Sequence, residues 1–193
     1  MNFSMLFSYT FLTAYTPGPN NIMAMTNASR DGMKRSIPFL WGIFSGFAIV
    51  MTACAAFTSL LYKFIPAIRP VMVWLGAAYI LWLAWTVWRD KPGKKKKGMT
   101  QTNSFASGML LQFVNIKIIL YGITAMSSYI LPYYHGALTI ELFALLLCLI
   151  GTSGCVCWAF FGAAFEKLFT KYRRQVNAIM ALLLVYCAVS LFL

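Results

Sequence analysis

The stretch LFALLLCLIGTSGCVCWAFFGAAF, residues 142–165, decides the fold class of this chain, because none of its side chains is charged. A helix needs about 20 mostly apolar residues to cross the roughly 30 Å hydrocarbon core of a membrane. A membrane-barrel strand would instead alternate apolar and polar residues over about 10 positions. This stretch does not alternate, so it predicts a membrane-spanning helix.

Five further stretches have the same apolar character, which brings the expected number of spans to six. The six predicted spans cover residues 3–28, 37–62, 71–88, 108–131, 142–165 and 176–193. The connections between them are short and leave no room for a separate soluble domain. We therefore expect an all-α, polytopic membrane protein whose residues 1–193 form one transmembrane domain with six transmembrane helices.

The composition excludes several other classes of protein. Of the 193 residues, 61% are hydrophobic and only 10% are charged, and the mean hydropathy is +0.73. A soluble domain carries about 25% charged residues, so a soluble enzyme and a secreted module are both excluded. Intrinsic disorder is excluded because it requires low hydrophobicity. The composition has one further unusual feature, a formal net charge of +12.

The positive charges gather in alternate loops, which indicates orientation rather than nucleic-acid binding. Basic residues enriched beside the spans mark the cytoplasmic side of a membrane protein. The enriched loops hold Arg30, Lys34 and Arg35; then Arg89, Lys91, Lys94, Lys95, Lys96 and Lys97; then Lys167, Lys171, Arg173 and Arg174. The opposite loops hold only Lys63 and Arg69. This asymmetry predicts cytoplasmic basic loops and periplasmic termini.

The cysteines and the histidine do not form a recognisable catalytic or metal site. All five cysteines fall inside predicted spans, where a free thiol behaves as a small apolar residue. Cys155 and Cys157 are two positions apart, which puts them on nearly opposite faces of a helix. His135 is the single histidine of the chain. We expect no cofactor and no metal.

A double-proline break interrupts the first predicted span in Thr16-Pro17-Gly18-Pro19-Asn20-Asn21. Proline has no backbone N–H, so the carbonyls of Thr13 and Tyr15 lose their helical partners. Irregular backbone at this depth is tolerated only against protein or a wet cavity. The break is either a structural kink or, as we favour, a broken helix in a substrate site.

The fourth predicted span carries a polar segment at a similar depth, with Gln112, Asn115 and Lys117. A lysine at a helix centre costs roughly 2.5–3.5 kcal/mol on the insertion scale, so a partner or water is expected nearby. The lysine either snorkels to the interface or belongs to a site. The first and fourth spans enter from opposite sides, which predicts an inverted repeat of three plus three helices. In such transporters the interrupted helices of the two halves meet at the binding site.

These two segments together predict a site for a small zwitterion. A half-helix that begins near Pro19 would offer backbone N–H groups to a carboxylate, assisted by Lys117. The freed carbonyls of Thr13 and Tyr15, with Asn20 and Asn115, would suit an ammonium group. The predicted substrate-binding residues are Pro17, Gly18, Pro19, Asn20, Asn21, Gln112, Asn115 and Lys117.

The chain resembles the lysine-exporter superfamily, in its threonine/homoserine exporter branch. The resemblance rests on Pro17-Gly18-Pro19-Asn20, on Gly32, Gly42 and Gly46, on Gly76-Ala77-Ala78-Tyr79 and on Asn115-Ile116-Lys117. Within that branch, residues 113–122 and 181–189 are most similar to the exporters of cysteine and O-acetylserine. The resemblance implies an exporter of small neutral amino acids in the bacterial inner membrane, driven by proton antiport.

Two departures from the family pattern bear on the mechanism. Several relatives have an acidic residue where this chain has Asn20, and asparagine does not titrate, so the proton carrier is left open. Many relatives have proline where this chain has Ile116, which predicts a weaker break in span four.

The expected partners are an amino-acid substrate, the lipid bilayer and, in a homo-oligomer, further copies of the chain, with no nucleic acid. A membrane-embedded enzyme acting on lipid or thiol and a non-transporting interaction subunit are the alternatives.

Overall fold

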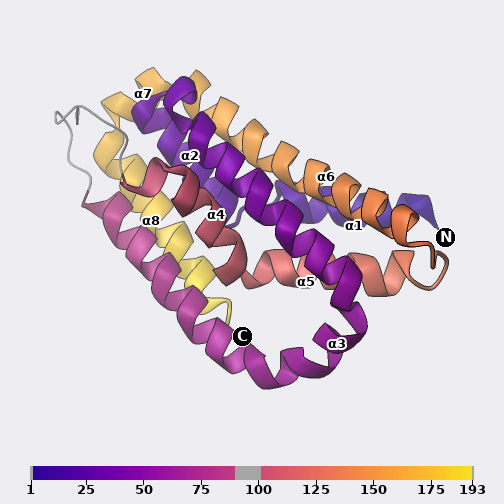
Figure 1. Ribbon diagram of the computed structural model, residues 1–193. Helices are drawn as coiled ribbons and strands as arrows, with labels where there is room; N and C mark the ends of the chain where they lie inside the picture. Colours follow the sequence, from indigo (N-terminus) through magenta and orange to yellow (C-terminus); the bar gives the residue numbers. More distant parts are fainter. Residues whose placement is uncertain (1, 90–100, 193) are drawn as a thin grey trace.

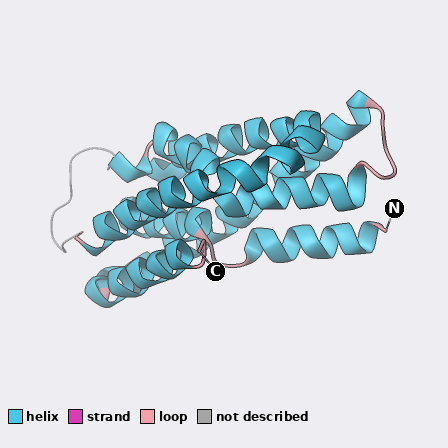
Figure 2. Cartoon of the chain, turned by 90° about the horizontal axis from the view of Figure 1, so that it is seen from below, coloured by secondary structure: helices cyan, strands magenta, loops and turns pink. Residues whose placement is uncertain are grey.

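The computed structural model describes residues 2–89 and 101–192, except for the side chains of residues 57–69, 72, 101 and 170. The elements are α1 (Phe3–Tyr15), α2 (Pro19–Asp31), α3 (Met33–Trp88), the 3₁₀-helix η1 (Gln101–Asn103), α4 (Phe105–Val114), α5 (Ile116–Thr124), the π-helix η2 (Ala125–Ile130), α6 (Ala137–Ala164), α7 (Glu166–Lys171) and α8 (Arg173–Val189). The helices lie side by side in a bundle (Figure 2). The prediction of an all-α fold is confirmed for the described residues.

Two helices within the described residues are long and apolar enough to cross a membrane. They are the first part of α3, Met33–Ala56, and the whole of α6. A third span forms if α4 and the helix that follows it, Ile116–Ile130, are taken together across their bend. Val73–Trp88 is apolar but shorter. The number of six spans therefore stays a prediction.

The second and third predicted spans are one continuous helix, so the loop expected between residues 62 and 71 was wrong. Helix α3 runs from Met33 to Trp88 and turns back on itself in a wide curve (Figure 1). Pro66 and Pro70 fall in this curve. Proline can bend a helix as well as end it, which is why an apparent loop signal accompanies helical backbone. The side chains of Lys63 and Arg69 lie outside the described part of the chain, as does the segment with Lys91 and Lys94–Lys97.

Both helices with polar interruptions are broken near their middle. The first span divides into α1 and α2, and α2 begins at Pro19 as predicted. The fourth span divides at Asn115, whose backbone is extended with φ −88° and ψ 94°. The axis bends by 62° at this single residue. An extended Asn115 therefore interrupts the helix without proline, and the expectation that this break is weaker than the first stays a prediction.

Each broken helix packs against a long unbroken one. Helices α1 and α2 lie along α6, and α4 lies along the first part of α3, whose second part packs on α8. Glycine allows the α3–α4 approach: a Cβ on Gly42 would overlap the carbonyl of Phe105, and one on Gly108 would overlap the carbonyl of Phe39. Gly42 and Gly108 therefore allow the close packing of these two helices. The two breaks are thereby held in the interior of the bundle.

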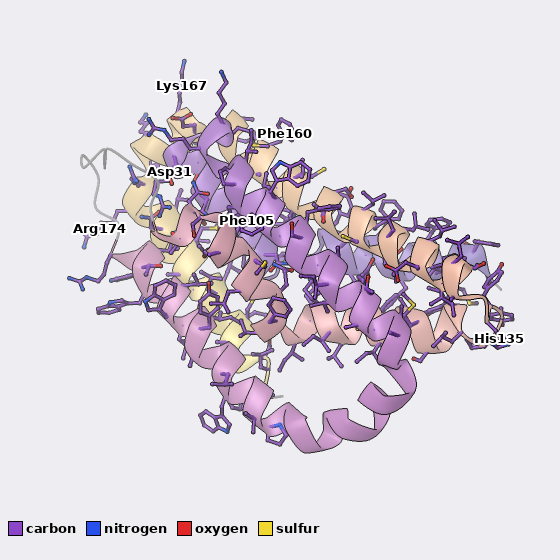
Figure 3. The ribbon with its side chains drawn as sticks, viewed as in Figure 1. Asp31, Phe105, His135, Phe160, Lys167 and Arg174 are labelled. Carbon is purple, nitrogen blue, oxygen red and sulfur yellow. The ribbon has the colours of Figure 1, made fainter. Side chains whose placement is uncertain are left out.

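One end of the bundle carries a buried ion pair and much of the described positive charge. Asp31, Lys167 and Arg174 lie at this end and His135 at the opposite one (Figure 3). Arg30 and Asp31 pair at 3.1 Å, with side chains only 9% and 12% exposed. Asn103 of η1 donates its amide to Asp31 at 2.9 Å. The pair thus ties the turn after α2 to the start of α4.

Candidate functional site

A small cavity of about 20 Å³, enough for about one water molecule, lies where the two breaks meet. Helices α1, α2, α3, α5 and α6 and both breaks contribute to its walls. The lining residues are Thr13, Ala14, Gly18, Asn20, Asn21, Phe47, Asn115, Lys117, Ile118, Tyr121, Gly151 and Cys155. In Figure 1 the junction of α4 and α5 lies near the middle of the bundle. A cavity at the meeting point of two interrupted helices is a suitable place for a transported solute.

Backbone carbonyls that the first break leaves without helical partners accept hydrogen bonds from a nearby side chain. The Asn21 amide nitrogen donates to the carbonyls of Ala14 at 2.8 Å and Thr16 at 2.9 Å. Asn21 therefore bridges from α2 back to the end of α1. Gly18 is the N-cap of α2 with no side-chain cap, and Pro19 takes the first helical position. Proline is favoured there because its missing N–H has no intrahelical acceptor.

A cluster of three amides connects the two breaks. The Asn20 amide nitrogen donates to Gln112 Oε1 at 2.7 Å, and Gln112 Nε2 donates back to Asn20 Oδ1 at 3.3 Å. Asn115 Nδ2 also donates to Asn20 Oδ1, at 3.1 Å. All three side chains are at most 4% exposed. Buried amides with several partners are fixed in orientation, so this cluster sets the geometry between α2 and α4.

Lys117 brings positive charge to the same cavity. Its Nζ donates to the Thr16 carbonyl at 3.1 Å and to Thr16 Oγ1 at 3.0 Å. A Cβ on Gly18 would lie only 3.1 Å from Nζ, so the ammonium sits against the start of α2. The N-terminus of a helix also attracts anions, through free N–H groups and the helix dipole. Two positive features therefore converge at one point of the cavity.

The remaining wall is apolar and aromatic. It consists of Phe47 of α3, Ile118 and Tyr121 of α5, and Gly151 and Cys155 of α6. The rings of Phe47 and Tyr121 meet edge to face, with centroids 5.8 Å apart. The cavity thus has polar lining residues at the breaks and mostly apolar ones from α3, α5 and α6. Such division suits a solute with a charged head and a short, weakly polar tail.

The structure brings most of the predicted site residues together. Gly18, Asn20, Asn21, Asn115 and Lys117 line the cavity, while Gln112 lies behind it and holds Asn20. Pro17 and Pro19 do not line the cavity. They shape the break from which the lining residues project. Lys117 lines the cavity and bonds to the exposed Thr16 of the first break, and its role in binding stays a prediction.

Both carbonyls freed by the first break have partners within the protein. The Tyr15 carbonyl accepts the indole N–H of Trp158 at 3.1 Å, and the Thr13 carbonyl accepts the Thr16 hydroxyl at 3.1 Å. Each oxygen accepts one bond and keeps a second lone pair, so their role toward an ammonium group stays a prediction. The side-chain oxygens of Asn20, Asn21 and Asn115 at the cavity likewise already accept bonds within the protein.

Sequence reasoning did not identify the apolar wall. Phe47, Tyr121 and Gly151 sit in ordinary apolar stretches, and nothing in the local pattern separates them from packing residues. The spacing of Cys155 and Cys157 did predict opposite faces, and the structure confirms it: Cys155 is buried and Cys157 is exposed. Cys155 donates its S–H to Asn21 Oδ1 at 3.2 Å.

Comparison with known proteins supports a transporter. Residues 11–193 match the model of the family described as LysE type translocator. The chain is 46% identical over 189 residues to the cysteine/O-acetylserine efflux protein of Escherichia coli (strain K12), covering 98% of this chain and 96% of the relative. The proteins of that name from Escherichia coli O157:H7 and Shigella flexneri serotype 5b (strain 8401) give the same identity and coverage. No solved structure matches the chain.

These relatives are named for efflux and the family for translocation, so the chain is a transporter rather than an enzyme. The match runs nearly from end to end and includes both breaks and the cavity between them. The chain belongs to the LysE type translocator family.

Proposed function

We propose that this protein exports small neutral amino acids, with cysteine and O-acetylserine as its principal cargo, across the bacterial inner membrane. The names of relatives 46% identical over 98% of the chain support the cargo. The cavity supports the chemical class. Its amides and its ammonium suit a zwitterionic head, and its apolar wall suits a short neutral side chain.

The observation that carries this proposal is the position of Lys117. Its Nζ lies against Gly18 at the start of α2, where helix and side chain both favour an anion. The carboxylate of an amino acid fits this point. Among the described residues that line the cavity, Lys117 is the one with a formal charge. A neutral amino acid therefore balances its own ammonium with amide oxygens such as that of Asn20.

We propose that the basic end of the bundle faces the cytoplasm and that both chain termini are periplasmic. Asp31, Lys167 and Arg174 share one end, and His135 and the N-terminus lie at the other (Figures 1 and 3). The positive-inside rule assigns the basic end to the cytoplasm. Residues 1–193 then form one domain with six spans, in which the curved α3 supplies the second and third.

An inverted repeat of three plus three helices accounts for the paired breaks. In this scheme α1 and α2 correspond to α4 and α5, the first part of α3 to α6, and its second part to α8. The packing supports the scheme: α2 lies on α6, α4 lies on the first part of α3, and the last members of the two halves, the second part of α3 and α8, meet. Alternating access then consists of one half rocking against the other around the cavity.

Proton antiport is the coupling we propose, on the strength of the family resemblance. Asp31 lies at the end of α2 away from the first break, is bonded to Arg30 and Asn103, and does not line the cavity. A protonophore added to energised cells is expected to slow export while the protein level stays constant. Homo-oligomerisation is compatible with this scheme and is tested by crosslinking in membranes.

A flux assay tests the proposed function. Purified protein is reconstituted in vesicles with an imposed proton gradient, and the movement of cysteine, O-acetylserine and a panel of other amino acids is measured. We expect saturable movement of small neutral amino acids that protein-free vesicles lack. Equal rates in both preparations would contradict the proposal. Movement of charged amino acids alone would contradict the cargo.

A further inference from the structure

We propose that Phe47, seated on Gly151, limits the width of the amino-acid side chain that the cavity accepts. This inference rests on the proposed function, because it assigns the apolar wall to the side chain of the exported amino acid. The polar side of the cavity, with Lys117 and the amides, holds the charged head. The tail of the same molecule then points to the opposite wall, where Phe47 is the largest side chain beside Tyr121.

The position of Phe47 depends on the absence of a side chain at residue 151. A Cβ added to Gly151 would overlap atoms Cζ and Cε2 of the Phe47 ring. Phe47 is 1% exposed, so its ring is enclosed by protein and by the cavity. The ring has no polar atom that anchors it. Its place is therefore set by packing, and Gly151 provides the space that keeps the ring out of the cavity centre.

Tyr121 supplies the fixed side of the wall. Its hydroxyl donates to the Leu147 carbonyl of α6 at 3.1 Å, and its ring stacks on Tyr9 with centroids 6.0 Å apart. Phe47 meets the other side of this ring edge to face. Since Tyr121 is held by a hydrogen bond and two aromatic neighbours, the adjustable member of the wall is Phe47.

The consequence is selection by side-chain width. A thiol side chain is short and unbranched and an acetyl ester is flat, whereas leucine branches at a tetrahedral carbon and phenylalanine carries a ring. A close-packed aromatic wall resists expansion because interiors are packed as densely as crystals. We therefore expect narrow side chains to be accepted and branched or aromatic ones rejected by the same surface.

The first experiment widens the wall. Phe47→Leu keeps an apolar side chain but removes the ring, and vesicle uptake of leucine and cysteine is measured for each protein. One methylene in an apolar pocket changes selectivity about 10- to 200-fold. We expect the leucine-to-cysteine rate ratio to rise at least about tenfold. The matched control is Phe44→Leu on the same helix, because Phe44 does not line the cavity.

The second experiment narrows the cavity with one substitution and restores its width with another. Gly151→Ala adds a methyl group that must displace the Phe47 ring, and we expect O-acetylserine transport to fall more than cysteine transport. The double variant Gly151→Ala/Phe47→Leu gives the methyl group room again, so we expect it to recover most of the transport. A purely structural defect at Gly151 would not be rescued by a second substitution at Phe47.

The outcomes separate this inference from the proposed function. Wild-type protein without amino-acid flux overturns the proposed function itself. Wild-type flux with an unchanged leucine-to-cysteine ratio in Phe47→Leu overturns the width limit alone. So does a double variant as inactive as Gly151→Ala while folded protein is present at wild-type level. A raised ratio together with rescue supports Phe47 as the residue that sets side-chain width.

Discussion

The amides of Asn20 and Gln112 bond to each other in both directions, at 2.7 and 3.3 Å, across the boundary between α2 and α4. Each residue comes from a different broken span, 92 positions apart in the chain. Because Asn20 also accepts a bond from Asn115, the orientation of one amide depends on both spans. This relationship couples the two breaks that enclose the cavity.

Removal of the Asn20 amide is expected to weaken both folding and transport. Asn20→Leu leaves the buried Gln112 and Asn115 amides without their partner, at a cost of about 1–3 kcal/mol. Thermal unfolding in detergent measures the stability, and vesicle flux measures transport. Gln112→Leu serves as the comparison, because Gln112 does not line the cavity. We expect similar destabilisation but a smaller loss of flux. Equal flux in both variants would show that Asn20 has no role beyond packing.

Removal of the hydrogen-bond donor to the Tyr15 carbonyl, at the first break, is expected to reduce transport more than expression. Trp158→Phe removes the indole N–H that the Tyr15 carbonyl accepts, but it keeps an aromatic ring on α6. The loss of this hydrogen bond costs about 0.5–1.5 kcal/mol. We expect the rate of cysteine flux to fall while the protein still reaches the membrane. Wild-type flux in Trp158→Phe would mean that this carbonyl needs no partner.

Joining α1 to α2 is expected to stabilise the helix and stop transport. Pro17→Ala/Pro19→Ala restores two backbone N–H groups and favours continuous helix, since proline costs about 3 kcal/mol in a helix interior. Circular dichroism then shows equal or greater helicity, while efflux from cells declines. The control is Pro132→Ala, because Pro132 lies outside both breaks, between η2 and α6. Full efflux by the double variant would contradict a role for the break.

The buried ion pair at the basic end is expected to contribute to stability only as a pair. Arg30→Met removes the guanidinium that pairs with the nearly buried Asp31 carboxylate at 3.1 Å, which costs up to about 3–5 kcal/mol. Arg30→Met/Asp31→Leu removes both charges, and we expect it to recover much of that loss. Thermal unfolding of the two variants provides the measurement. A double variant that is less stable than Arg30→Met would contradict this prediction.

Much of this architecture follows from the sequence because the membrane imposes strict rules. Apolar length predicts helices, and polar residues inside them mark the breaks, so Pro19 and Asn115 were found without a structure. The curve of α3 was not predictable in this way, because prolines at a bend and at a loop look alike. The apolar wall was missed for a related reason: Phe47 and Gly151 meet only through the packing of α3 on α6.

The partners of the polar groups also depended on tertiary structure. Proline chemistry correctly predicted which carbonyls the first break frees. That these carbonyls accept hydrogen bonds from Trp158 and Thr16 became visible only in the structure, which places α6 and the local turn. Lys117 was identified because a lysine in the middle of a membrane-spanning helix raises the free energy of insertion. Its bonds to Thr16 show that the same cost is offset by groups from the opposite break.

The most direct measurement of the central claim is amino-acid flux through Lys117→Met in vesicles, compared with wild type and Lys117→Arg. A charged hydrogen bond contributes about 1.5–3 kcal/mol, which corresponds to roughly tenfold or more in affinity. We predict at least about a tenfold loss of cysteine flux in Lys117→Met and partial activity in Lys117→Arg, at equal protein level. Wild-type flux in Lys117→Met would contradict the claim that this ammonium, at the meeting point of two broken helices, binds the exported amino acid.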